Sequence, residues 1–355
     1  MYKQLKEYGL TDRFEQEATL HDGLFLARVC AQHRELYKVV GEGGTMSAAV
    51  SGKLAYSAKS ALDFPAVGDW VMVDRLDNTA GNAVIHHILR RKSVFTRQAA
   101  GTANEQQVVA ANIDTVFICM SLNADFNLRR VERYLAIAWD SMATPVIVLT
   151  KADLCAVLPQ KMDEIAAVSV GVDVIACSAE DNDYRDVAAH AQPGKTIAFL
   201  GSSGVGKSTL INRLMGEDVL AVSAIRQDDD KGRHTTTHRQ LLRMPNGCIV
   251  IDTPGMREVQ IYAGNLSKTF EDVEDIICSC KYNNCSHKSE PGCAVIAAIA
   301  CGQLQQERYD SYLKLQREVA YSGLNARQLE NEKINRMFGS KNELKQVMRH
   351  IKKKR

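Results

Sequence analysis

The sequence lacks any apolar run that approaches the roughly 18 residues needed to cross a bilayer. Its first segment, MYKQLKEYGLTDRFEQEA, carries charges throughout and contains no apolar stretch of the kind found in signal peptides. Internal repeats and low-complexity tracts are missing as well. We therefore expect a cytoplasmic protein with no membrane partner.

The chain also has little net charge, +2 over 355 residues, but this charge is unevenly spread. Between residues 331 and 355, nine Lys or Arg face only two Glu, a local balance of +7 that leaves −5 for the rest. Such a tail is either a solvated helix end or an arm that binds the phosphates of a nucleic acid. The tail alone does not decide between these interpretations.

Residues from about Leu24 to Arg97 form short alternating runs separated by Gly, Asn and Asp. This pattern is typical of strands and turns, and it predicts a small all-β unit. A five-stranded oligonucleotide-binding (OB) type barrel is the economical choice, although an SH3-like barrel fits the same pattern. Four basic residues at its end either contact a phosphate backbone or form a solvated strand end: Arg90, Arg91, Lys92 and Arg97.

From Ile113 onward, apolar runs such as VFICM, PVIVLT, TIAFLG and CIVI alternate with helical patterns. Continuous apolar strands, each followed by a helix, predict a parallel sheet covered on both faces. The sequence after residue 265 contains a cysteine-rich segment followed by helix-forming residues. We predict a multidomain α/β protein with domains at residues 1–105, 106–265 and 266–355.

The segment GSSGVGKS at residues 201–208 matches the phosphate-loop pattern G-x-x-x-x-G-K-[ST], between a predicted strand and a predicted helix. Its glycines let backbone N–H groups surround a phosphate at a helix N-terminus. We expect Lys207 to reach the β- and γ-phosphates and Ser208 to bind Mg²⁺. The motif does not separate ATP from GTP. The predicted contacts are Gly201, Ser202, Ser203, Gly204, Val205, Gly206, Lys207, Ser208 and Thr209.

Two further segments complete the predicted phosphate and magnesium site. Asp252 ends an apolar strand within DTPG, where its carboxylate can hold the Mg²⁺ shell and the Gly255 amide can sense the γ-phosphate. The polar loop KGRHTTT at residues 231–237 is of the kind that closes on Mg²⁺. Thr236 is the preferred metal ligand, with Thr235 and Thr237 as rivals.

The base is predicted to bind at TKAD, residues 150–153, which resembles the N-K-x-D guanine element of GTPases. Asp153 can accept hydrogen bonds from guanine N1–H and the exocyclic amine, and Lys151 can lie along the base. Thr150 departs from the usual Asn and lacks its bridging amide. The following Ser178 and Ala179 resemble the backbone clamp on guanine O6.

The order of these motifs is permuted, because the base elements precede the phosphate elements along the chain. These motifs lie at the carboxyl ends of predicted strands. Because the carboxyl ends of parallel strands meet at one edge of a sheet, the motifs can still form one site. Permutation also joins the segment after Asp252 directly to the C-terminal domain, which suggests a relay from the nucleotide to that domain.

The cysteines of the chain fall into two groups, and a cytoplasmic protein is not expected to use them as disulfides. Five lie singly and are typical of buried core residues, whereas the other five lie between Cys278 and Cys301. Among these, Cys280, Cys285, His287 and Cys293 form a Cys₃His set of the kind that closes a structural zinc site. Cys278 is the rival of Cys280, and such a knuckle can also bind RNA.

Together these motifs resemble the ribosome small-subunit-dependent GTPase A (RsgA) family of permuted GTPases, over essentially the whole chain. The resemblance is carried by VGDWV at 67–71, GSSGVGKST at 201–209, GRHTTTHR at 232–239, DTPG at 252–255 and the cysteine motif. It implies an N-terminal OB barrel, a circularly permuted P-loop GTPase domain and a C-terminal zinc-binding helical domain with one Zn²⁺, and it supports Cys280 as the ligand.

The family resemblance also implies the activity and the partners. It implies a monomeric, Mg²⁺-dependent enzyme that hydrolyses GTP to GDP, binds the small ribosomal subunit and its rRNA, and acts in late maturation of that subunit. Met256 occupies the position at which many GTPases have a water-orienting Gln, so we predict slow intrinsic turnover. His234 is a candidate catalytic residue beside Lys207 and Thr236, unless the ribosome supplies the missing group.

Two other functions compete with this prediction. An RNA-binding assembly chaperone, in which GTP only sets a conformation, is favoured by Met256. A P-loop ATPase or small-molecule kinase is disfavoured by Asp153 and by the lack of an acceptor-substrate motif.

Overall fold

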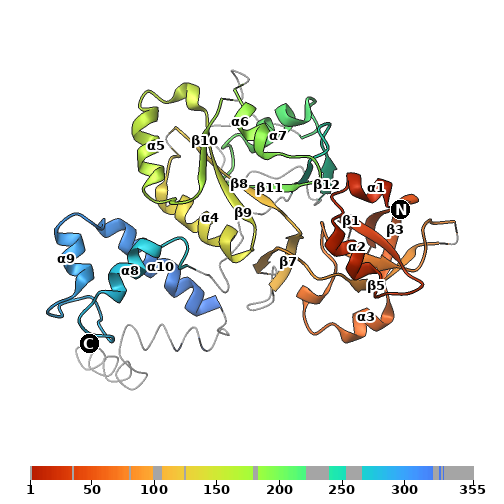
Figure 1. Cartoon of the computed structure of the whole chain (residues 1–355), viewed down its shortest axis with the longest axis horizontal. Coiled ribbons are helices and arrows are strands. Elements are labelled where there is room, and N and C mark those ends of the chain that lie inside the picture. Colours follow the sequence, from red (N-terminus) through yellow and green to blue (C-terminus); the bar gives the residue numbers. More distant parts are fainter. Residues whose placement is uncertain are drawn as a thin grey trace, which may run out of the picture.

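The computed structural model describes residues 2–33, 36–79, 81–98, 106–123, 125–178, 183–220, 240–252, 266–322, 328 and 331. In Figure 1 a β-barrel, an α/β sheet and a group of C-terminal helices lie side by side. No helix in the described ranges is long and apolar enough to span a bilayer.

The N-terminal body is a five-stranded barrel preceded by two short helices. Its strands run in the order β1-β2-β3-β5-β4, and β4 pairs back with β1 to close the ring. Most neighbours are antiparallel, but β3 and β5 pair in parallel. This closure confirms the predicted OB-type barrel. Its elements are α1 (Lys3–Glu7), α2 (Asp12–Ala18), β1 (Phe25–His33), β2 (Leu36–Gly41), β3 (Gly44–Val50), α3 (Gly52–Ser57), η1 (Ala61–Asp63), β4 (Trp70–Val73) and β5 (Ala83–Ile88).

The VGDWV segment joins the barrel to the chain that leads into the central body. Asp69 is fully buried and accepts both ends of the Arg91 guanidinium, at 2.7 and 2.8 Å. Gly68 has a φ of 93°, and a Cβ there would lie 2.2 Å from the Ala111 carbonyl oxygen. Only glycine therefore allows the barrel to contact the chain that leads into the next body.

The central body is a sheet with the strand order β10-β9-β8-β11-β13-β12. The first five strands are parallel, and β12 is an antiparallel edge strand. A hairpin of β6 (Val94–Gln98) and β7 (Gln106–Ala111) precedes it. The other elements are β8 (Thr115–Ser121), α4 (Leu128–Asp140), β9 (Thr144–Thr150), η2 (Ala152–Leu154), α5 (Leu158–Ala166), β10 (Asp173–Ala176), α6 (Arg185–His190), β11 (Thr196–Leu200), α7 (Lys207–Met215), β12 (Gln240–Arg243) and β13 (Ile249–Asp252).

Alternate residues of these strands enter two different cores. Val116 and Ile118 of β8 join the cluster that α4 and α5 cover, whereas Phe117 and Cys119 join the cluster that α6 and α7 cover. The sheet is therefore buried on both faces, which explains its continuous apolar strands and confirms the predicted α/β architecture. The sheet also meets the barrel directly, because Ala31 of β1 pairs with Gln240 of β12.

The barrel and the sheet share a buried arginine. The Arg28 guanidinium donates to the Gly68 carbonyl at 3.3 Å, to Thr196 Oγ1 at 2.9 Å and to the Tyr8 carbonyl. It also lies 5.2 Å from the centre of the Trp70 ring. Burial lowers the pKa of Arg28 to about 10, so the cation is retained near neutral pH.

The C-terminal body consists of α8 (Glu271–Cys278), α9 (Ala294–Ala300) and α10 (Gln306–Ser322). It packs against α4 of the sheet through a buried ion pair between Arg308 of α10 and Glu132 of α4, 2.8 Å apart. Arg133 of α4 forms a second ion pair with Glu318 of α10. The helices therefore join the central body on the face that α4 covers (Figure 1).

Candidate functional site

The phosphate loop lies between β11 and α7, at the carboxyl end of the central strand. Gly201, Gly204 and Gly206 have φ values of 151°, 74° and 95°, which favour glycine. A Cβ at Gly201 would lie 2.6 Å from the Cys119 carbonyl oxygen of the neighbouring strand. The loop is therefore a glycine cradle at a helix N-terminus, which is the geometry that binds phosphate.

Lys207 and Asp252 supply charged groups near this cradle. Lys207 Nζ donates to the carbonyl oxygens of Gly201 at 2.8 Å and Ser202 at 2.6 Å. Asp252 ends β13, the strand beside β11. Burial raises the pKa of the Asp252 carboxyl, and the positive charge of Lys207 opposes that shift. With Ser208 in the first turn of α7, these groups have the chemistry that holds Mg²⁺ and phosphate.

The predicted base motif is bonded directly to the phosphate loop. Thr150 Oγ1 donates to the Val205 carbonyl at 2.5 Å, and Lys151 Nζ donates to the Gly204 carbonyl at 3.0 Å. Lys151 is itself in the left-handed region, with a φ of 59°. The hydroxyl of Thr150 therefore keeps a link between the two motifs without the amide of an asparagine.

Asp153 and Ser178 occupy neighbouring strand ends. Asp153 is exposed within η2, which follows β9. The Ala152 amide donates to the Cys177 carbonyl at 3.2 Å and so joins this turn to the residue before Ser178. Ser178 is buried and exchanges backbone hydrogen bonds with Asp183. The structure thus brings Asp153, Ser178 and the phosphate loop together along one edge of the sheet.

One arginine of the site is missing from the sequence prediction. Arg130 of α4 donates from Nη1 to Ser202 Oγ at 2.7 Å, and to both carboxylate oxygens of Asp125 at 2.8 Å. The only signal in the sequence is that Arg130 lies in the first turn of the helix after β8, the strand that pairs with β11.

The predicted zinc ligands form a compact cluster. The ligand atoms of Cys280, Cys285, His287 and Cys293 all lie within 4.8 Å of one another. His287 Nδ1 is 3.5 Å from the sulfur atoms of both Cys280 and Cys293. Zinc with ordinary bond lengths in a tetrahedral site separates nitrogen and sulfur by about 3.6 Å, so these residues fit Zn²⁺.

The loop around His287 is also held by hydrogen bonds to a carboxylate. The Glu290 carboxylate accepts hydrogen bonds from the backbone N–H groups of Ser286, Lys288 and Ser289 at 2.9 to 3.1 Å. His287 has a φ of 57°, a conformation that this loop stabilises. Cys278, the rival ligand, is exposed and lies outside the cluster.

Several predicted residues lie outside the described ranges. These are Ala179, His234, Thr235, Thr236, Thr237, Gly255, Met256 and nearly all of the basic tail after residue 331. Their predicted roles remain predictions.

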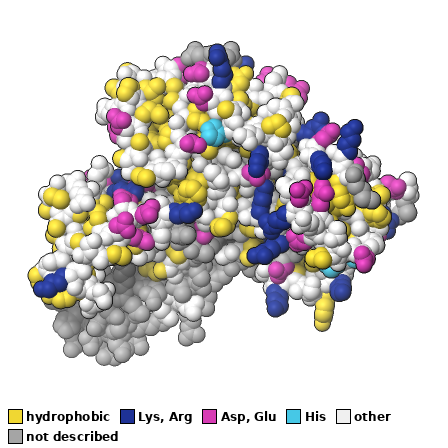
Figure 2. Space-filling view, in the orientation of Figure 1, with side chains coloured by type: hydrophobic (Ala, Val, Ile, Leu, Met, Phe, Trp, Pro, Cys, Tyr) yellow, Lys and Arg dark blue, Asp and Glu magenta, His cyan; other side chains and the backbone are white. Residues whose placement is uncertain are grey.

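Two of the four residues in the basic cluster predicted at the end of the barrel form ion pairs within the protein. Arg91 is bound to Asp69, and Lys92 Nζ lies 2.6 Å from Asp114. Figure 2 shows Lys and Arg side chains near the junction of the barrel with the central body. The charges of Arg91 and Lys92 are therefore paired within the protein.

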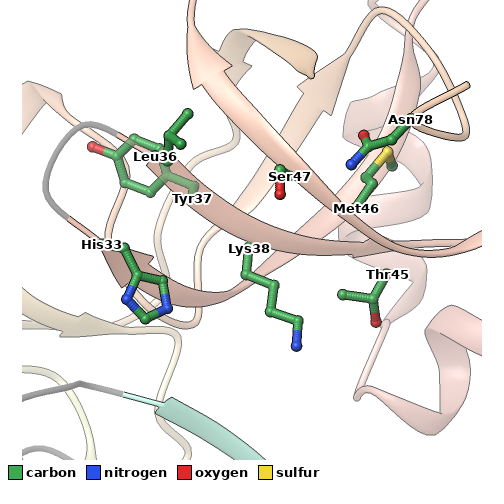
Figure 3. A pocket seen from close by; sticks show the side chains of 8 residues that line it. All are labelled: His33, Leu36, Tyr37, Lys38, Thr45, Met46, Ser47 and Asn78. Atoms are coloured by element: carbon green, nitrogen blue, oxygen red, sulfur yellow. The ribbon is translucent and has the colours of Figure 1, made fainter. Parts of the chain in front are cut away.

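A shallow groove of about 350 Å³ lies on the outer surface of the barrel (Figure 3). None of its lining residues is acidic, and Lys38 and His33 supply a cation and an imidazole. Strands β2 and β3 and the loop before β5 form its walls, which is the face that OB barrels use for oligonucleotides. The other lining residues are Leu36, Tyr37, Thr45, Met46, Ser47 and Asn78.

Two family models match the chain. The one described as RsgA GTPase matches residues 88–262, and the one described as ABC transporter matches residues 184–351. Both ranges include the phosphate loop, but only the first includes Asp153. The phosphate loop is common to both classes of nucleotide-binding protein, and it lies within both matched ranges.

Curated relatives match nearly the whole chain. "Small ribosomal subunit biogenesis GTPase RsgA 2" from Lactiplantibacillus plantarum is 55% identical over 347 residues, which cover 97% of each chain. "Small ribosomal subunit biogenesis GTPase RsgA 1" from Listeria innocua is 43% identical and covers 89% of this chain and 90% of its own. A relative named RsgA from Methanosarcina acetivorans is 40% identical, with 93% and 90% covered.

Two solved structures have the same fold. YjeQ from Thermotoga maritima is 24% identical, with a TM-score of 0.61 over 84% of this chain and 99% of its own. YloQ, titled a circularly permuted GTPase, is also 24% identical, with a TM-score of 0.58 and with 86% and 98% covered. The fold, the permuted motif order and the full-length relatives agree, and the chain belongs to the RsgA family of circularly permuted GTPases.

Proposed function

We propose that this protein is a Mg²⁺-dependent GTPase that binds the small ribosomal subunit and acts in its late maturation. The proposal of guanine-nucleotide binding rests on direct hydrogen bonds between the base motif and the phosphate loop. Thr150 donates to the Val205 carbonyl, and Lys151 donates to the Gly204 carbonyl. This bonding supports a single site in which Asp153 reads guanine beside the phosphate cradle.

Different residues of the site bind the phosphates, the Mg²⁺ ion and the guanine base. Residues 201–209 hold the phosphates, Lys207 neutralises the β- and γ-phosphate oxygens, and Asp252 and Ser208 hold Mg²⁺. Thr236 completes the Mg²⁺ shell, and Gly255 contacts the γ-phosphate. Asp153 and Lys151 select guanine, with Ser178 and Ala179 at its O6.

Zinc is proposed as the structural cofactor of the C-terminal body, with one ion per chain. When bound, it supplies four bonds that cross-link a segment with few buried apolar residues. All four positions of a tetrahedron are filled by Cys280, Cys285, His287 and Cys293, so this site leaves no position for a substrate.

The ribosomal partner is supported by the names of the full-length relatives, which are small ribosomal subunit biogenesis GTPases. The groove on the barrel supports an RNA contact, because it is free of acidic residues and lies on the oligonucleotide-binding face of the OB fold. We propose that the rRNA of the subunit occupies this groove.

The testing experiment measures phosphate release from GTP and from ATP, with and without purified small subunits. We expect GTP to be hydrolysed and ATP not, and we expect subunits to raise the rate. Equal turnover of ATP would reject the guanine assignment, and subunits that neither bind the protein nor stimulate it would reject the ribosomal partner. Lys38→Glu should weaken binding to the subunit and leave basal hydrolysis unchanged, whereas Lys161→Glu on α5 serves as a charge-matched control.

Met256 favours a second candidate function, an RNA-binding assembly chaperone whose GTP only sets a conformation. Comparing His234→Ala with the wild type, with and without subunits, separates a histidine that positions water from a ribosomal group that does so. An unchanged stimulated rate would remove His234 from the mechanism. The proposal further includes a cytoplasmic, monomeric protein with domains at residues 1–105, 106–265 and 266–355.

A further inference from the structure

A guanidinium lies against the phosphate loop from a helix that carries none of the nucleotide motifs. Asn127 caps α4 by accepting a hydrogen bond from the Arg130 backbone N–H at 3.1 Å, which fixes Arg130 in the first turn. From there Nη1 reaches Ser202 Oγ, at the second position of the loop, at 2.7 Å. Lys207 binds the carbonyl of the same residue at 2.6 Å, so two cations meet at Ser202.

Arg130 has donors left for another ligand. Its guanidinium carries five N–H groups, and among the described residues only Nη1 has partners, namely Asp125 and Ser202. The side chain of Arg130 is 30% exposed and that of Asp125 is 40% exposed. A pair of this exposure contributes little to folding stability, so stability alone does not account for the contact with the loop.

The chemistry of the site calls for a positive charge at this place. In hydrolysis the oxygen of water bonds to the γ-phosphorus while the bond from that phosphorus to the β–γ bridging oxygen breaks. The electron pair stays on the bridging oxygen, which becomes part of GDP, and both protons of the water leave on the phosphate. Negative charge therefore spreads over the γ-phosphoryl and bridging oxygens, where arginine donors accelerate such reactions.

We propose that Arg130 is a catalytic residue that the chain supplies to itself. With GTP bound, the guanidinium moves past Ser202 to the γ-phosphoryl oxygens and stabilises the transition state, while Asp125 holds the side chain in place beforehand. The inference rests on the nucleotide site proposed above and adds a residue to it. Arg130 stays protonated throughout and does not orient the water, so it complements the group that replaces glutamine.

The test compares full-length wild type with Arg130→Ala, Arg130→Lys and Asp125→Asn. Arg213→Ala is the matched control, because Arg213 is an exposed arginine at the far end of α7. Single-turnover GTP hydrolysis, affinity for GDP, and affinity for GDP with aluminium fluoride, a mimic of the transferring phosphoryl group, are measured for each. GDP affinity also reports whether each variant is folded.

We expect Arg130→Ala to lower the hydrolysis rate about a hundredfold and to weaken binding of GDP with aluminium fluoride in parallel. GDP affinity should stay within about twofold of wild type, because GDP lacks the γ-phosphate. Lysine at position 130 should recover part of the rate, and Asp125→Asn should lose much less than Arg130→Ala, because it leaves the cation in place.

An unchanged rate in Arg130→Ala would overturn the proposal, as would a rate loss matched by an equal loss of GDP affinity, which indicates a structural role. A wild type that fails to hydrolyse GTP even with subunits would instead overturn the proposed function, and the role of Arg130 with it. A wild type that hydrolyses GTP beside an equally active Arg130→Ala would overturn only the role of Arg130.

Discussion

At the scale of single residues, Thr150 has the role that an amide has in the N-K-x-D pattern. Its hydroxyl is buried and bonds to the Val205 carbonyl of the phosphate loop. A contact between the base motif and the loop is therefore present with threonine at position 150, and in the proposed site guanine is selected by Asp153.

Thr150→Val removes this hydroxyl at almost constant volume and leaves the Val205 carbonyl without its donor. A neutral hydrogen bond of this kind contributes about 1 kcal/mol, so GTP and GDP affinities should each fall about fivefold. Thr150→Ser keeps the hydroxyl and should retain nearly all affinity. Titration with fluorescent guanine nucleotides measures both, and equal affinities for the Thr150→Val variant and the wild type would contradict the role of the hydroxyl.

Asp153→Asn tests the choice of base. The asparagine amide cannot accept from both guanine N1–H and the exocyclic amine, so GTP affinity should fall about a hundredfold. Xanthosine triphosphate carries a carbonyl in place of that amine and should bind the variant better than it binds the wild type. Competition titrations with the two nucleotides measure the change, and unaltered GTP binding would place the guanine contact elsewhere.

At the scale of elements, α4 connects the phosphate loop with the C-terminal helices. Its first turn places Arg130 on Ser202, and the next residues place Glu132 and Arg133 on α10. Glu132 is fully buried, and its Oε2 has no partner among the described residues. One helix therefore contacts both the nucleotide site and the helical body, a second connection beside the chain segment after Asp252.

Arg308→Ala should destabilise this junction strongly. The Arg308 guanidinium binds Glu132, Asp272 and the Thr269 carbonyl, and its loss leaves Glu132 buried with only Arg129 as a partner among the described residues. Breaking a buried pair in this way costs about 3 to 5 kcal/mol. The free energy of unfolding in urea measures the loss.

Two controls accompany that measurement. Arg317→Ala removes an exposed arginine from the same helix, whose side chain donates to the Leu313 carbonyl of its own turn, and should change stability by less than about 0.5 kcal/mol. Replacing Glu132 and Arg308 together by Leu and Met should recover most of the lost stability, because no charge then remains buried. A single Arg308→Ala variant as stable as wild type would contradict the network.

At the scale of the whole molecule, one segment differs from the rest in what stabilises it. The barrel, the sheet and the C-terminal helices contribute to buried apolar cores, whereas the segment from Cys280 to Cys293 contains no regular helix or strand. We expect this segment to depend on the metal, and we expect the barrel and the sheet not to depend on it.

Removing zinc with a chelator should unfold the C-terminal body first, while GDP binding persists. Metal analysis should give one Zn²⁺ per chain in the wild type and none in Cys285→Ser. Cys278→Ser and Cys301→Ser change exposed cysteines outside the cluster and should keep the ion. Circular dichroism before and after chelation measures the loss of helix, and full zinc in Cys285→Ser would refute the ligand set.

Much of the fold follows from local patterns in the sequence. The apolar runs of β8, β9, β11 and β13 predict buried parallel strands because both of their faces must be apolar. The spacing of Cys280, Cys285, His287 and Cys293 predicts the metal cluster because its turns are short. The phosphate loop can also be predicted from the sequence, because its glycines determine the backbone conformation of residues next to them in the chain.

What only the tertiary structure decided are contacts between residues far apart in the chain. Arg91 meets Asp69, Arg308 meets Glu132, and Arg130 meets Ser202, yet in the sequence each arginine resembles any solvated surface cation. No sequence pattern predicts which two charges will pair, because Coulomb attraction depends on the distance between them in space and not along the chain. The sequence by itself determined the domains' patterns, the phosphate loop and the family. The packing of α4 between two bodies decided which charges hold the molecule together and which one lies against the phosphate loop.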